Sequence, residues 1–161
     1  EKVNEHLMDC LDLLQKARLE FAYRTVKEIE RYMRVCYYLA EDKDEWKSSH
    51  RPTPDQLGIG HSNWLSDLDD EILQKILPKL HGSRNRIGSL IGALTNYMHS
   101  GDVQSAEAFF TEGGAEIAEK SISDPDFAEL KVEDARFPRS FRKLKAMAAI
   151  LVEEQFVSFI C

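Results

Sequence analysis

The sequence predicts a mainly helical, bundle-like domain with a short strand or hairpin near its C-terminal end. Three observations point to this fold class. Apolar residues recur at steps of three and four along stretches rich in good helix formers. Turn-forming residues gather between these stretches, and bulky residues alternate only in the final QFVSFIC. We expect one domain over 1–161, since a chain of this length can bury a substantial core.

The apolar periodicity predicts five helices, over residues 3–18, 22–40, 65–77, 84–99 and 138–154. Ser66 or Asp67 can cap the third helix and Ser83 the fourth, because their side-chain oxygens can accept hydrogen bonds from free backbone N–H groups. The third helix should stop or kink at Pro78, since proline has no N–H to donate within a helix. Pro138 suits the first turn of the last helix, where that N–H would be unpaired anyway.

The inward faces of these five helices define the expected core. Between the third and fourth helices we expect a turn, relaxed by Gly82. The side chains expected in the core are Leu11, Leu14, Val26, Ile29, Met33, Ile72, Ile76, Leu90, Leu94, Leu144, Met147 and Leu151.

Two segments lack long apolar periodicity and are expected to be loops or inserts. Residues 41–63 hold two of the five prolines and two of the eight glycines, which is typical of a long exposed loop. Residues 101–136 contain short helical stretches near 104–111 and 115–122, and we expect a polar linker after Pro125.

Composition and charge exclude several classes of protein. Lys and Arg number 21 against 28 Asp and Glu, and the net charge of −7 argues against a broad nucleic-acid-binding surface. No apolar run is long enough for a transmembrane span. Three widely spaced cysteines, Cys10, Cys36 and Cys161, indicate a reducing cytoplasm rather than a disulfide framework. Since the chain opens as if inside a helix and without Met, we expect a piece of a longer protein.

Motifs that carry catalysis are absent from the sequence. It contains no GxxxxGK[ST], GxGxxG, HExxH, CxxC or GxSxG motif. His6 and Cys10 share the i, i+4 spacing of one helix face, but one such pair does not make a zinc site, which normally takes four ligands. We therefore expect no metal site and no catalytic residue within these 161 residues.

Arginines in or beside the first turns of three predicted helices are the most informative polar residues. They are Arg24 in FAYRT, Arg84 and Arg86 in HGSRNR, and Arg139 and Arg142 in FPRSFRK. A cation there opposes the helix dipole, whereas a guanidinium and free N–H groups together can bind a phosphate. The alternative is that these arginines pair with carboxylates of neighbouring segments or reach solvent. The residues alone leave both interpretations open.

Three blocks, taken together and in order, resemble a known family. They are LEFAYRTVKEIERYM (19–33), DDEILQKILPKLHGSRNRI (69–87) and FPRSFRKLKAMAAILVEEQFVSFI (137–160). They resemble the C-terminal part of McrB-type AAA+ proteins, the NTP-driven motors of modification-dependent restriction and related antiviral defence systems. The resemblance covers about a third of the chain directly, and its spacing spans nearly all of it.

This resemblance implies that the chain is the helical lid subdomain that follows the AAA+ nucleotide-binding core. Arg24 would be the sensor arginine that reaches the γ-phosphate, and Arg84 and Arg86 are weaker candidates for contacts with nucleotide or with a neighbouring subunit. The parent would be an NTP hydrolase, using GTP or ATP with Mg²⁺. It would form a ring of identical subunits and drive a partner nuclease on DNA. The chain itself lacks the phosphate loop and the Walker B acids, so it cannot hydrolyse nucleotide alone.

Two alternatives to the lid interpretation stay open. One is a winged-helix nucleic-acid-binding module, in which Arg139, Arg142 and Lys143 form a basic patch and QFVSFI part of a wing. The other is a stand-alone helical protein-interaction domain that docks a partner through an exposed apolar helix face.

Overall fold

The computed structural model describes residues 2–19, 23–48, 63–111, 116, 120 and 124–160. Within them the chain is mainly helical with one two-stranded antiparallel sheet, so the predicted fold class is confirmed. The helical stretch expected at 115–122 lies largely outside the described residues. So does most of the loop expected at 41–63.

The described residues of the first half of the chain form four α-helices, which are α1 (Lys2–Lys16), α2 (Tyr23–Leu39), α3 (Lys43–Lys47) and α4 (Trp64–Glu71). The short α3 lies where the sequence predicted only loop. Its N-cap is Asp42, whose carboxylate accepts hydrogen bonds from the backbone N–H groups of Asp44 and Glu45. Trp46 of α3 is buried, and its indole Nε1 donates to Asp67 Oδ2 over 2.7 Å. A cap and one buried aromatic side chain therefore suffice to order this turn.

The third predicted helix is confirmed as an element, but its cap prediction was wrong. The N-cap of α4 is Asn63, whose Oδ1 accepts from the backbone N–H of Ser66 over 3.0 Å. Ser66 and Asp67 lie inside the helix instead. The apolar pattern marked the buried face but not Trp64, which starts the helix earlier.

A π-helical turn, η2 (Ile72–Ile76), and a 3-10 turn, η3 (Leu77–Lys79), follow α4 directly. Pro78 explains why the regular α-helix gives way to these two turns. Its ring clashes with the carbonyl of the residue four positions before it, and it has no N–H to donate. Leu77 instead bonds to the carbonyl of Ile72. The prediction that the helix stops or kinks at Pro78 is confirmed.

The second half of the chain comprises β1 (His81–Ser83), α5 (Arg84–Ser100), α6 (Val103–Glu107), η4 (Ala108–Phe110), α8 (Pro125–Glu129), η5 (Val132–Asp134), α9 (Pro138–Glu154) and β2 (Phe156–Ser158). The helices predicted over 84–99 and 138–154 are confirmed, and so is the C-terminal strand. The turn expected at HGS is a strand that pairs with β2. The linker expected after Pro125 begins with a short helix, because Asp124 caps it by accepting the N–H of Asp126.

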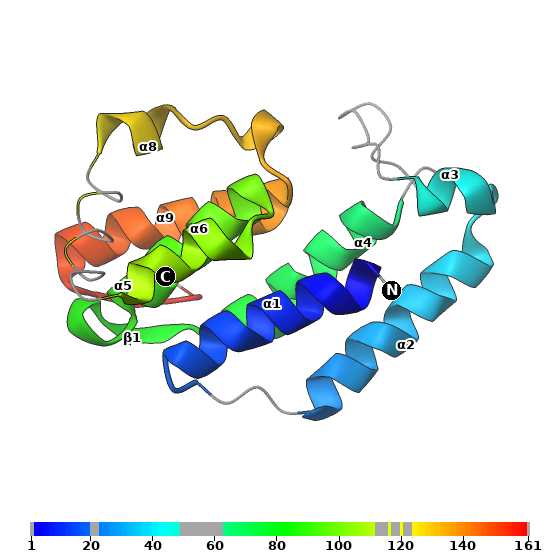
Figure 1. Ribbon diagram of the computed structural model, residues 1–161, viewed down its shortest axis with the longest axis horizontal. Helices are drawn as coiled ribbons and strands as arrows, with labels where there is room; N and C mark the ends of the chain where they lie inside the picture. Colours follow the sequence, from blue (N-terminus) through cyan, green and yellow to red (C-terminus); the bar gives the residue numbers. More distant parts are fainter. Residues whose placement is uncertain are drawn as a thin grey trace.

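Two long helices, α5 and α9, lie in the left part of the molecule as Figure 1 shows it. α5 and α9 pack along each other, and the β1–β2 pair joins the start of α5 to the end of α9. α1 and α4 pack beside them, and α2 packs on α4 at the outer edge. The N-terminal half is thus a layer of helices laid against the α5–α9 pair.

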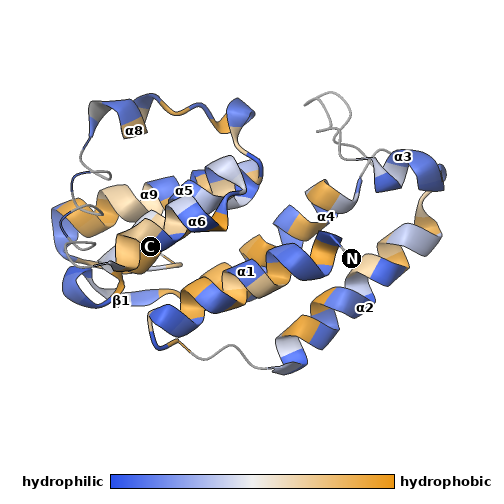
Figure 2. Ribbon diagram, viewed as in Figure 1, coloured by the Kyte–Doolittle hydropathy of each residue, from blue (hydrophilic) through white to orange (hydrophobic). Residues whose placement is uncertain are grey.

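Apolar side chains fill the space between these helices, and along α1 and α2 they form stripes that alternate with polar residues (Figure 2). Ten of the twelve expected core residues are buried. Leu11 and Val26 are only partly buried, which corrects their assignment to the core. The buried face of α1 includes Leu13 instead, and the buried face of α2 includes Thr25.

No helix in the described part of the chain is both long enough and apolar enough to span a membrane.

Candidate functional site

Arg24 lies in the first turn of α2, where the sequence predicted a helix start. Its side chain is 87% exposed, and its Nε donates to Glu28 Oε1 over 2.9 Å along the same helix. Within the described residues, Glu28 is the one acidic partner of this guanidinium. The hydrogen bond from Arg24 lowers the pKa of Glu28. The remaining N–H groups of Arg24 therefore face solvent and can reach an anion outside this domain.

Further cations surround Arg24 at the start of α2. Lys27 pairs with Glu30 over 2.8 Å, and its ammonium lies 5.3 Å from the centre of the Tyr23 ring. The hydrogen bond with Glu30 raises the pKa of Lys27. Lys75 of η2 lies 3.9 Å from Glu28, so positive side chains of two elements meet here.

Arg84 and Arg86 lie at the start of α5, which the strand pair holds in place. The backbone N–H of Arg84 donates to the carbonyl of Gln155 over 2.9 Å. Ser83 occupies the predicted N-cap position, although its side chain makes no capping hydrogen bond. Arg84 is partly buried and Arg86 is exposed. The start of α5 lies well apart from the start of α2, on the other side of the C-terminal end of α1 (Figure 1), so these arginines do not share a site with Arg24.

The start of α9 has its anion supplied by the chain itself. Asp69 of α4 is buried, and its carboxylate accepts the backbone N–H groups of Arg139 and Ser140 over 2.8 and 2.9 Å. The guanidinium of Arg139 forms an ion pair with Asp70 next to it. Of the two interpretations of arginine at a helix start, the geometry favours carboxylate pairing for Arg139.

The other two residues of the predicted basic patch, Arg142 and Lys143, differ in their exposure on α9. Arg142 is exposed, whereas Lys143 is partly buried and its ammonium lies 4.7 Å from the centre of the Phe159 ring. The three side chains therefore occupy neighbouring positions but have different surroundings, and they do not form one continuous cationic surface.

Sequence reasoning missed a buried polar cluster that joins α1 to α5. Tyr97 is buried, and its hydroxyl donates to Asp9 Oδ2 over 2.8 Å while lying 2.6 Å from His6 Nδ1. The His6 ring stacks on Trp64 and meets Phe137 edge-on. Burial lowers the pKa of His6, and the nearby Arg136 lowers it further. Only the tertiary fold brings these residues together, so no local pattern could have revealed the cluster.

The pair His6 and Cys10 does not make a metal site. Cys10 is completely buried, and burial raises the pKa of its thiol, whereas His6 is engaged with Tyr97. Among the residues that the structure describes, no group of three or more His, Cys, Asp and Glu side chains could hold a metal ion.

A hollow of about 220 Å³ lies between the C-terminal half of α5, η4 and α8. Phe109 and Phe127 form apolar walls, and Asn96, His99 and Asp126 contribute polar groups. Lys145 of α9 holds the end of α8 in place by donating to the carbonyls of Ala128 and Leu130 over 2.6 and 2.9 Å. The sequence segment 101–136, expected to be loop or insert, thus provides most of this hollow's wall.

Comparison with known proteins gives one family match. The family described as "Domain of unknown function (DUF8727)" matches residues 1–156. No curated protein and no solved structure matches the chain.

Proposed function

Since the chain belongs to the DUF8727 family, a domain of unknown function, we propose its function from its own residues. It is the helical lid subdomain of an AAA+ NTPase of the McrB type, and Arg24 contacts the phosphates of the nucleotide that the core domain binds. The supporting arguments are the resemblance of its three blocks, their arrangement in the fold and the exposure of Arg24.

The three blocks that carry the resemblance are neighbours in the fold. The middle block, 69–87, begins at the end of α4, which packs on α2 of the first block. Its Asp69 caps α9 of the third block, and its strand β1 pairs with β2 at the end of that block. A shared structural unit explains why the three blocks occur together and in this order.

The exposure of Arg24 is the observation that carries the proposal. A cation in the first turn of a helix opposes the helix dipole, so it needs an anion nearby to be favourable. Arg139, at the start of α9, has Asp70 and the capping Asp69. Arg24 has only Glu28 of its own helix among the described residues and is 87% exposed. An external phosphate would supply the anion at the start of α2 that Asp69 and Asp70 supply at the start of α9.

The proposal includes the remaining parts of such a motor. The longer chain would carry the nucleotide-binding core, use GTP or ATP with Mg²⁺, assemble as a ring in the cytoplasm and drive a partner nuclease on DNA. Arg84 and Arg86 lie apart from Arg24. This separation favours a role for the pair in contacts with a neighbouring subunit over a role at the nucleotide that Arg24 contacts. The winged-helix alternative has less support, because Arg139 is paired with Asp70 and Lys143 lies against Phe159.

NTPase turnover of the protein encoded by the complete native gene tests the role of Arg24. Losing a charge-assisted phosphate contact costs about 1.5–3 kcal/mol, so Arg24→Ala should lower turnover by about 10- to 150-fold. Arg24→Lys should retain part of the activity, since it keeps the charge but loses the planar fork.

Glu28→Ala is the matched control, because it removes the described partner of Arg24 and leaves the guanidinium in place. It should keep turnover within about twofold of wild type. Equal losses in Glu28→Ala and Arg24→Ala would show that Arg24 acts only within its helix. A native protein without NTPase activity would refute the lid proposal altogether.

A further inference from the structure

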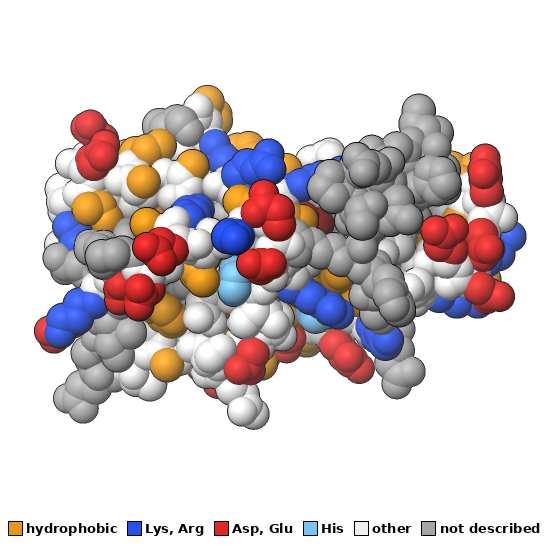
Figure 3. All heavy atoms as spheres, turned by 90° about the horizontal axis from the view of Figure 1, so that it is seen from above, with side chains coloured by type: hydrophobic (Ala, Val, Ile, Leu, Met, Phe, Trp, Pro, Cys, Tyr) orange, Lys and Arg blue, Asp and Glu red, His pale blue; other side chains and the backbone are white. Residues whose placement is uncertain are grey.

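The hollow between α5, η4 and α8 combines apolar walls with acidic side chains. Phe109 is the most buried of its lining residues, and Phe127 and Leu130 are partly buried against the core. Asp124 and Asp126 line the same hollow and are exposed. On the face of the molecule that carries α8, apolar and acidic side chains lie next to one another (Figure 3). The apolar part of the hollow is therefore the deeper part, and the carboxylates lie toward solvent.

Both carboxylates can accept further hydrogen bonds. Oδ1 of Asp124 accepts the backbone N–H of Asp126 over 2.9 Å. The described residues supply no partner for the second oxygen of Asp124 or for the carboxylate of Asp126. A donor that enters the hollow would therefore find free acceptors.

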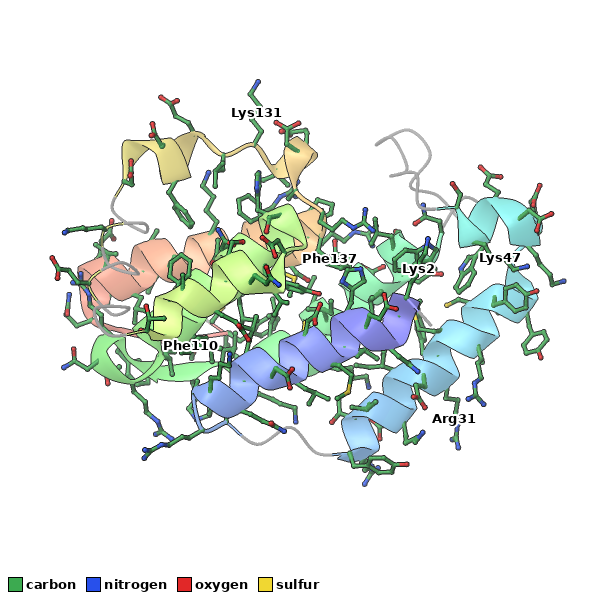
Figure 4. All side chains as sticks on the ribbon, viewed as in Figure 1. Lys2, Arg31, Lys47, Phe110, Lys131 and Phe137 are labelled. Atoms are coloured by element: carbon green, nitrogen blue, oxygen red, sulfur yellow. The ribbon has the colours of Figure 1, made fainter. Side chains whose placement is uncertain are left out.

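The lysines near α8 do not neutralise this acidic charge. Lys131 follows α8 in sequence, but it points away from the body of the molecule (Figure 4). Lys145 donates to two backbone carbonyls at the end of α8, over 2.6 and 2.9 Å. Among the residues that the structure describes, no lysine or arginine lines the hollow. Its side chains therefore favour a ligand that brings a positive charge.

The chain holds the walls of the hollow in place by its own hydrogen bonds. Asp124 caps the start of α8, and Lys145 secures its end. On the α5 side, Oδ1 of Asn96 accepts from the hydroxyl of Ser105 over 3.0 Å. A site that is already formed loses little conformational freedom when a ligand binds.

We infer that the hollow binds a small organic ammonium ion, with its carbon skeleton between Phe109 and Phe127 and its charged group at Asp124 and Asp126. Aromatic rings attract cations as well as apolar groups, and carboxylates form charge-assisted hydrogen bonds with an ammonium. An apolar cavity of about 150 Å³ can hold benzene, so a hollow of about 220 Å³ has room for one ring with a short amine arm.

Other ligands fit the hollow less well. The two carboxylates repel an anion such as a nucleotide or a carboxylic acid. A metal ion lacks ligands, since no suitable group of three or more side chains occurs in the described part of the chain. A neutral apolar molecule would contact the rings but would not use the acids. The inferred site goes beyond the proposed function and uses neither Arg24 nor the nucleotide, so the two can fail independently.

Nuclear magnetic resonance titration of the isotope-labelled 161-residue chain at about pH 7 tests the site. The probes are 2-phenylethylammonium, its neutral analogue 2-phenylethanol and the anionic phenylacetate. For so small a ligand we expect a Kd of roughly 1 mM for the ammonium. The alcohol should bind about two- to fivefold more weakly, since a partly exposed ion pair contributes modestly, and phenylacetate should not bind. The backbone N–H signal of Phe127 and the side-chain amide of Asn96 should shift.

Two aspartate variants separate the local carboxylate from the overall charge. Asp126→Asn should weaken binding of the ammonium by about two- to fivefold and leave binding of the alcohol unchanged, so the preference between the two probes disappears. Asp134→Asn makes the same change in net charge at an exposed position of η5 outside the hollow, and it should preserve the preference. Phe127→Ala should weaken binding of both probes. Circular dichroism checks that the variants remain folded.

The inference would be overturned if 2-phenylethylammonium and 2-phenylethanol bound equally well to the wild-type chain. An absence of shifts up to about 20 mM ammonium, well above the expected Kd, would overturn it too. So would equal effects of Asp126→Asn and Asp134→Asn, because the ammonium would then respond only to the overall charge of the chain.

Discussion

Asp69 shows how one residue determines the end of a distant helix. It lies on α4, yet its carboxylate occupies the first turn of α9 and accepts two backbone N–H groups there. The hydroxyl of Ser140 returns a hydrogen bond to the Asp69 carbonyl over 3.2 Å. Phe137, at the N-cap position, has no side-chain oxygen with which to cap the helix. The capping group for α9 must therefore come from another element.

Replacing Asp69 by Ala should destabilise the fold by about 2–4 kcal/mol, since it removes a cap and leaves two N–H groups near the core without an acceptor. Urea denaturation followed by circular dichroism measures this loss. Asp70→Ala is the control, because the pair between Asp70 and Arg139 is partly exposed and should contribute no more than about 1 kcal/mol. Equal effects of the two substitutions would contradict the capping role of Asp69.

The elements divide into those that local sequence determines and those that it does not. α5 and α9 match their predicted bounds to within one residue, because a long apolar period, Gly101 at one end and Pro138 at another mark them locally. The α4 cap was misassigned although it is local, because the apolar pattern does not include Asn63 and Trp64. α3 and β1 were missed or misassigned, since each depends on a partner distant in sequence. Trp46 needs Asp67, and His81–Ser83 needs β2.

The same division holds for the candidate site. The sequence predicted that Arg24 starts a helix, and the structure places it there, exposed. It could not predict that Asp69 and Asp70 meet the start of α9, because the helical and strand periodicities of a sequence carry no information about which helices contact each other. The hydrogen bond between His6 and Tyr97 could not be predicted either, because it arises from the packing of α1 on α5.

Gly82 in β1 is the position at which the strand pair constrains residue type. Its φ of +152° is one that residues with a side chain rarely adopt, and an added Cβ would lie 3.3 Å from Ile87 Cγ2. Gly82→Ala should therefore destabilise the protein by about 1–3 kcal/mol. Thermal and urea unfolding of the variant measure the change.

Gly88 offers a control of opposite sign within the neighbouring helix. It lies inside α5, and an added Cβ would meet only Arg84 Cγ at 3.8 Å, an ordinary contact. Gly88→Ala should stabilise the protein by about 0.5–1 kcal/mol, since alanine loses less conformational freedom in a helix. A stabilising Gly82→Ala would show that the strand geometry at β1 is wrong.

At the scale of the whole molecule, His6 connects several of the packed segments. It lies on α1, reaches Tyr97 of α5, stacks on Trp64 of α4 and meets Phe137 at the start of α9. Burial is the main reason that its pKa is lowered. Arg136 lowers it further, whereas Asp9 and Glu5 oppose the shift. A neutral imidazole at this junction is therefore part of the native packing.

This lowered pKa makes the stability of the fold depend on pH. In the unfolded chain His6 binds a proton near its ordinary pKa of 6.5, whereas in the folded chain it does so only at lower pH. Between these two values the unfolded state holds more protons, so the contribution of His6 is complete above 6.5 and is lost as the pH falls below it. The slope from this one group cannot exceed about 1.4 kcal/mol per pH unit.

Urea unfolding at several pH values between about 7.5 and 5 isolates this contribution when wild type is compared with His6→Gln. The wild-type free energy of unfolding should fall more steeply with decreasing pH than that of His6→Gln, because glutamine does not titrate. Parallel curves for wild type and His6→Gln would mean that His6 titrates alike in both states, which would contradict its burial between α1, α4 and α5.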